Sequence, residues 1–66
     1  MLVAIEAKDP AQVDRLHAIA LANGGSDEGA PGPRGDADAQ GNTFYAGYFR
    51  DRDGNKLNAF CMAQLG

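Results

Sequence analysis

The stretch that decides the fold is residues 44–62, FYAGYFRDRDGNKLNAFCM, which has the pattern of two β-strands joined by a tight turn. Residues 51–54 (DRDG) are typical of a type I turn followed by a residue in the left-handed region, and Gly54 takes that conformation at little cost. This turn predicts a register in which Phe49 lies opposite Leu57, with the pairing continuing outward along both strands.

Side chains alternate between the two faces of such a hairpin, and here both faces are apolar. The first face carries Tyr45, Gly47, Phe49, Leu57, Ala59 and Cys61. The second face carries Phe44, Ala46, Tyr48, Asn58, Phe60 and Met62. The hairpin therefore needs cover on both sides.

The first part of the chain supplies one strand and one helix. Residues 2–7 alternate as a strand would, and the helix that follows is predicted to run to about Asn23. Asp9 suits the N-cap, Pro10 suits the first helical position, and Gln12 completes a capping-box pattern with Asp9. The packing stripe of this helix is expected to be Val13, Leu16, His17 and Ala20.

Residues 25–42 have a different composition, rich in Gly, Pro and Asp and without a large apolar side chain. We expect a short edge strand at about 26–30, where prolines are tolerated, and then a mobile loop. The predicted order is βαβββ. The fold class is therefore α+β: one domain over residues 1–66, with a mostly antiparallel sheet and one helix on one face.

The single helix can cover only one face of this sheet. Gly47 and Ala59 leave room for it on the first face, so the second face is left without cover from this chain. Uncovered apolar faces of this kind mark interfaces or ligand grooves. We therefore predict that the module pairs with a second module, and that the following residues form a ligand pocket or dimer face: Leu2, Ala4, Glu6, Phe44, Ala46, Tyr48, Asn58, Phe60 and Met62.

The composition of the chain argues against some classes of binding partner. A formal net charge of −3 argues against nucleic acid or an anionic membrane surface, because both attract positive proteins. No apolar run has the length of a membrane span, and the apolar start at residues 1–5 is too short for a signal peptide. The lone cysteine, Cys61, lies in an apolar strand and is interpreted as a buried structural thiol. These features predict a cytoplasmic protein.

The chain resembles one βαβββ module of the vicinal oxygen chelate superfamily, which includes glyoxalase I, bleomycin-resistance proteins and extradiol dioxygenases. The similar parts are residues 13–17 with 20–25, then 29–32, then 44–60. Where the family commonly has D-P-D-G-N, an apolar residue and Glu, this chain has DRDGNKLN at residues 51–58. The resemblance is to the second, C-terminal module of such proteins.

The resemblance implies that two modules pair into a cupped sheet around a small-ligand pocket. A second copy of this chain would supply the other module in a homodimer; an N-terminal module of a longer protein would do the same. The function expected from the resemblance is small-ligand binding by the paired modules. The alternative is the C-terminal part of a metal-dependent lyase or dioxygenase, so the sequence leaves open whether the chain is an enzyme.

At two positions this chain differs from the family's pattern, and both differences argue against metal binding. Metal-binding members often have His in the first strand and Glu after the D-G-N turn, and the matching positions here are Leu2 and Asn58. Neither is a good ligand for a divalent metal. We expect no tightly bound metal or other cofactor, unless another module supplies the ligands.

Each candidate side chain has a functional and a structural interpretation. Asn58 could orient a substrate, although an amide paired across a dimer interface is favoured. Glu6 could be an acid at the pocket rim and Tyr48 a hydrogen-bond donor, but a solvated or ion-paired Glu6 and a packed Tyr48 are favoured. His17, the only histidine, is interpreted as a packed or partly exposed structural residue away from the cup. No catalytic residue is assigned.

Overall fold

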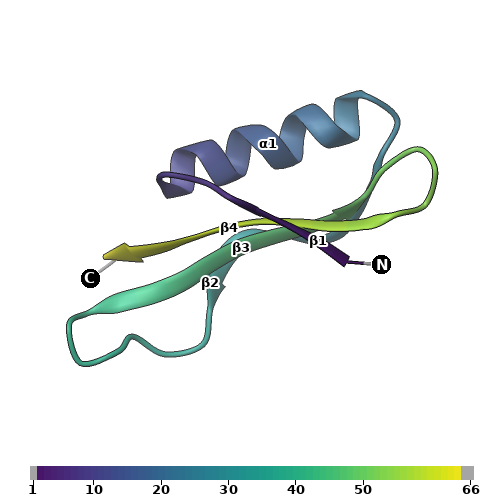
Figure 1. Cartoon of the computed structure of the whole chain (residues 1–66). Helices are drawn as coiled ribbons and strands as arrows, with labels where there is room; N and C mark the ends of the chain where they lie inside the picture. Colours follow the sequence, from purple (N-terminus) through teal and green to yellow (C-terminus); the bar gives the residue numbers. More distant parts are fainter. Residues whose placement is uncertain (1, 65–66) are drawn as a thin grey trace.

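A computed structural model describes residues 2–64 of the chain. The elements follow in the order β1 (Leu2–Glu6), α1 (Pro10–Ala22), β2 (Ser26–Arg34), β3 (Asn42–Arg50) and β4 (Lys56–Gln64). The four strands form one sheet in the order β1-β4-β3-β2, and α1 lies across one face of it (Figure 1). Only the β1–β4 pairing is parallel, so the predicted α+β module with a mostly antiparallel sheet is confirmed.

The hairpin of β3 and β4 has the predicted register, with Phe49 opposite Leu57 at the turn. Gly54 has φ +87°, and its N–H donates to the carbonyl of Asp51 at 3.0 Å. The Asp51 carboxylate closes the turn by accepting from the backbone N–H groups of Asp53 and Asn55, both at 2.9 Å. Side chain and backbone therefore fix the same turn.

Helix α1 begins as its capping residues predict. The Asp9 side chain accepts from the N–H of Gln12 at 2.8 Å, and Pro10 occupies the first turn. The Gln12 side chain reaches back to the N–H of Lys8, also at 2.8 Å, one residue earlier than in a standard capping box. The helix ends at Ala22, one residue before the predicted end.

The core lies between α1 and the sheet. Val13 is fully buried on the helix, and Ala59 is fully buried on β4 beneath it. A methyl group added to Gly47 would come within 3.2 Å of His17 Cδ2 and 3.0 Å of Pro31 Cγ. The prediction that Gly47 and Ala59 make room for the helix is therefore confirmed.

Strand β2 is longer than the sequence predicts. We expected a strand at about 26–30 and a loop from there to residue 42, whereas β2 runs from Ser26 to Arg34 and the loop covers only 35–41. The strand passes through Pro31 and Pro33 because it lies at the sheet edge, where a missing N–H costs no ladder bond on the outer side. Register irregularities on either side of Gly29 absorb the remaining mismatch with β3. Among residues 2–64 no helix is both long and apolar enough to cross a membrane.

Candidate functional site

The face of the sheet opposite α1 is called the open face here. Strand pairing brings the nine predicted pocket or dimer-face residues onto it. Asn58 lies between Ala4 of β1 and Tyr48 of β3, and the next pair along β4 places Phe60 between Glu6 and Ala46. Leu2, Phe44 and Met62 lie on the same face at its two ends. The structure thus gathers these residues, while their role in binding or pairing stays a prediction.

Asn58 is the most buried polar side chain on the open face, with 5% of its surface exposed. Ala46, which lies diagonally across the hairpin from Asn58, is fully buried. No buried side-chain nitrogen or oxygen within residues 2–64 is left without a hydrogen-bond partner. The two interpretations of Asn58, a substrate-orienting amide and an amide paired across a dimer interface, therefore stay predictions.

Large apolar groups surround these buried positions. The rings of Phe44 and Phe60 stack with their centroids 5.6 Å apart and an interplanar angle of 26°. Leu2 is 59% exposed and Met62 is 56% exposed, at opposite ends of the face. An apolar surface that carries a stacked aromatic pair and two exposed large side chains has the character of an interface or a ligand site.

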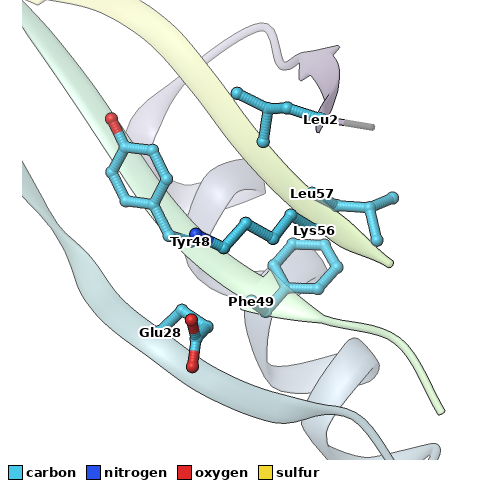
Figure 2. Close-up of a pocket in the computed structure, with 6 residues that line it drawn as sticks. All are labelled: Leu2, Glu28, Tyr48, Phe49, Lys56 and Leu57. Carbon is cyan, nitrogen blue, oxygen red and sulfur yellow. The ribbon is translucent and has the colours of Figure 1, made fainter. Parts of the chain in front are cut away.

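A hollow of about 220 Å³ opens at the end of the open face that is nearest the hairpin turn (Figure 2). We call it the Tyr48 hollow, and it is lined by Leu2, Glu28, Tyr48, Phe49, Lys56 and Leu57. Leu2 and Tyr48 were among the predicted site residues, whereas Glu28 and Lys56 were not. Figure 2 shows the Lys56 side chain running along the sheet so that its nitrogen lies beside Tyr48.

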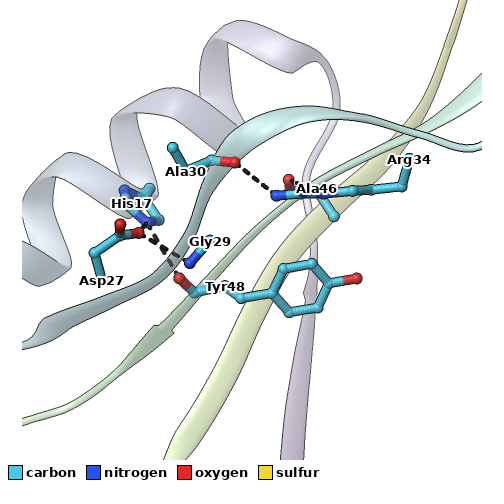
Figure 3. A network of polar contacts seen from close by, with 7 residues as sticks. All are labelled: His17, Asp27, Gly29, Ala30, Arg34, Ala46 and Tyr48. Carbon is cyan, nitrogen blue, oxygen red and sulfur yellow. Dashed lines mark hydrogen bonds and ion pairs between the residues drawn. The ribbon is translucent and has the colours of Figure 1, made fainter.

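Two arginines that the sequence analysis did not predict contact residues that line this hollow. Arg50 Nε lies 3.4 Å from Glu28 Oε1, and both side chains are about two-fifths exposed. The guanidinium of Arg34 lies over the Tyr48 ring, 5.2 Å from its centroid, in a cation–π contact. Its nitrogens donate to the carbonyls of Ala30 at 2.6 Å and Ala46 at 3.3 Å (Figure 3).

His17 lies on the helix side of the sheet, buried to 5% exposure, as its structural interpretation predicts. Its Nε2 is 3.0 Å from Asp27 Oδ1 and 3.2 Å from the carbonyl oxygen of Tyr48 (Figure 3). Both partners accept hydrogen bonds, so Nε2 carries the proton. The ring also meets Phe49 edge to face, with centroids 5.9 Å apart. His17 therefore fastens α1 to the sheet and contributes nothing to the open face.

Two more titratable groups belong to the helix-side core. Burial raises the pKa of the Cys61 thiol, and the charges of Asp9 and Asp14 add to the effect. Cys61 is 3% exposed, which confirms its buried position. The Tyr45 hydroxyl donates to Asp14 Oδ1 at 2.8 Å, and this hydrogen bond raises the pKa of Tyr45.

The donor set of the open face does not fit a divalent metal. The two positions at which the family resemblance implies a metal-binding His and Glu hold Leu2 and Asn58. Within residues 2–64, no three side chains of His, Cys, Asp or Glu come together as a metal site would require. No chemical step through a metal can be derived from the residues of this module.

The fold and the open face define a class of protein: a single βαβββ module with one sheet face covered by its helix and the other uncovered. The chain matches the crystal structure of a glyoxalase/bleomycin resistance protein from Albidiferax ferrireducens T118, with a TM-score of 0.77 and 37% sequence identity. The match covers 92% of this chain and 46% of that chain. No protein-family model and no curated protein matches the chain.

The TM-score, the identity and the coverage of this chain show that it has the fold of a βαβββ module of a glyoxalase/bleomycin resistance protein, as the resemblance implied. The chain spans slightly less than half the length of that relative. Its correspondence to the C-terminal module in particular stays a prediction.

Proposed function

We propose that this chain is a ligand-binding module that pairs through its open face with a second βαβββ module, and that the paired modules enclose a small molecule. The observation that carries this proposal is the exposure of Leu2 and Met62, each more than half exposed, beside the Phe44–Phe60 stack. Burying these groups against a second apolar face would be favourable, because each Å² of apolar surface removed from water contributes about 25 cal/mol.

The second module is proposed to be another copy of the chain. A C2 dimer places the same surface on both sides of an interface, and a continuous apolar sheet face meets that requirement. The relative from Albidiferax ferrireducens T118 is more than twice as long as the part that matches, which leaves room in it for a second module. A second module supplied by a longer chain would cover the same face.

The enclosed ligand is proposed to be a small apolar or aromatic molecule. The Tyr48 hollow supplies apolar walls, and the buried amide of Asn58 supplies a polar group that could set orientation. The module itself is proposed to hold no tightly bound metal, because Leu2 and Asn58 replace the expected ligands. No residue of the open face favours the alternative of a metal-dependent lyase or dioxygenase. We place the protein in the cytoplasm, where a lone buried thiol is commonly found.

Light scattering after size-exclusion chromatography tests the pairing directly. We expect a particle of twice the 6.9 kDa chain mass, with a monomer fraction that grows on dilution. The same samples should show a folded circular dichroism spectrum at every concentration. A folded monomer throughout the concentration range would overturn the homodimer.

A further inference from the structure

The Tyr48 hollow has a charge balance that selects among small ligands. Lys56 lies opposite Arg50 in the register of β3 and β4, and like charges in this arrangement repel one another. Arg50 has a carboxylate partner in Glu28, at 3.4 Å. Within residues 2–64, no carboxylate lies within ion-pair distance of Lys56. The two cations at this end of the sheet therefore share one anion, and the unmatched charge is at Lys56.

A third cation increases the positive potential. Arg34 lies over Tyr48, and its nitrogens bond to the backbone carbonyls of Ala30 and Ala46 rather than to a carboxylate. Three of the six basic residues of the chain thus lie at or beside the hollow: Lys56 lines it, and Arg50 and Arg34 contact its lining residues Glu28 and Tyr48. With the one carboxylate of Glu28 subtracted, these groups carry a net charge of +2, although the chain as a whole has a net charge of −3. A concentration of one sign of charge around a concave, partly apolar surface attracts small ions of the other sign.

The rest of the hollow is apolar. Leu2 lies opposite Lys56 on the β1 side, and Tyr48 bounds the hollow on the β3 side. Its volume of about 220 Å³ is below the range of roughly 300–1,000 Å³ that is usual for pockets of drug-sized ligands. The occupant must therefore be small, with an apolar body and one anionic end.

We infer that the Tyr48 hollow binds small monocarboxylates with an apolar or aromatic body, the carboxylate on the Lys56 ammonium and the body between Leu2 and Tyr48. The inference rests on the proposed function, since it specifies the ligand class of the same open face. The ammonium of Lys56 supplies up to three donors to a carboxylate. The Glu28 carboxylate, held by Arg50, keeps a second negative group out of the hollow and so disfavours dicarboxylates.

Benzoate and benzamide make a matched pair of probes, because they have nearly the same shape and differ in charge. Each is titrated into the ¹⁵N-labelled chain of 66 residues at constant ionic strength, and amide shifts are followed by NMR. We expect benzoate to give saturable shifts at Leu57, Tyr48 and Lys56, and benzamide to bind more weakly. Equal affinity for benzoate and benzamide would overturn the inference.

Two lysine variants separate a specific contact from general attraction. Lys56→Gln should weaken benzoate binding about fivefold, as expected for loss of one exposed charge pair, and leave benzamide binding unchanged. Lys8→Gln removes the same charge from an exposed position outside the hollow and should change neither. Equal effects of the two variants on benzoate would contradict the inference.

Light scattering on the NMR samples keeps this test distinct from that of the proposed function. Charge-selective benzoate binding by a monomer would support the ligand class and overturn the homodimer. A dimer that binds benzoate and benzamide equally well would support the homodimer and overturn the ligand class.

Discussion

The ring of Phe44 stacks on that of Phe60 across the β3–β4 ladder, with 5.6 Å between their centroids, on the sheet face that α1 does not cover. Phe44 is also the register partner of Met62, whose side chain is 56% exposed. Aromatic pairs of this kind contribute about 0.5–1.5 kcal/mol beyond their burial. The stacked rings and the exposed Met62 beside them therefore form one continuous apolar surface.

Met62→Lys is predicted to separate the paired modules without unfolding them. A charge at this position would have to be buried in the interface, which is unfavourable unless a partner neutralises it. We expect the dissociation constant of the dimer to rise at least about tenfold, which corresponds to about 1.4 kcal/mol. Sedimentation equilibrium or light scattering at several concentrations measures the change.

Ile19→Lys is the matched control for that experiment. Ile19 is 57% exposed, almost the same fraction as Met62, but it lies on α1 at the other side of the sheet. This variant should leave the dissociation constant unchanged. If both lysine variants disturb the dimer equally, the open face is not the interface.

Much of the fold could be predicted because the turn residues and the alternation of apolar side chains both indicate the same β3–β4 hairpin. The turn at Gly54 sets the β3–β4 register, and the alternation of side chains then assigns each hairpin residue to a face. The same alternation, continued by one residue, places Arg50 with Tyr48 and Lys56 with Asn58. The strand alternation alone therefore predicts that these two cations lie on the open face, although the apolar pattern of the hairpin gives no sign of them.

Strand β2 could not be predicted in the same way. Its composition indicates a loop, and only pairing with β3 holds it extended through Pro31 and Pro33. The register irregularities around Gly29 then decide which of its side chains reach the open face. Glu28 and Arg34 depend on this register, so no local pattern could place them beside Tyr48. Tertiary pairing overrides local preference here.

Gly47→Ala is predicted to destabilise the protein. The added methyl group would lie 3.0 Å from Pro31 Cγ, 3.3 Å from Pro31 Cα in the backbone and 3.2 Å from His17 Cδ2. The His17 ring is held by its hydrogen bonds to Asp27 and to the carbonyl of Tyr48. Overpacking of this kind costs about 1–3 kcal/mol and outweighs the roughly 0.5–1 kcal/mol gained by removing a glycine from a strand. Urea unfolding followed by circular dichroism gives the difference in free energy.

The companion variant is Gly32→Ala, on the neighbouring strand. No atom lies within 4 Å of the added methyl group there, so only the gain from a less flexible unfolded chain applies. Gly32→Ala should be neutral or slightly stabilising. Similar losses of stability in the two variants would show that close packing at Gly47 is not the cause.

Asp51 is predicted to make stability depend on acidity. The Asn55 side chain and backbone donate to its carboxylate and hold its pKa below the ordinary 3.8. A depressed pKa in the folded state contributes stability that is present above 3.8 and is lost as pH falls through the folded-state value. Asp51→Asn should flatten the dependence of unfolding free energy on pH in that acidic window. An unchanged dependence of unfolding free energy on pH in Asp51→Asn would contradict this assignment.

Cys61 is predicted to react slowly with a thiol reagent such as dithionitrobenzoate while the protein is folded. Only 3% of its surface is exposed, and burial raises its pKa, so both access and the thiolate fraction are low. The reaction must then wait for a local or global opening of the core, and we expect it to be at least about tenfold slower than in concentrated urea. Gly47→Ala, which lowers the free energy of that opening, should speed the reaction under native conditions, whereas Gly32→Ala should not. A native rate equal to the rate in urea would mean that the strand bearing Cys61 is not held beneath α1.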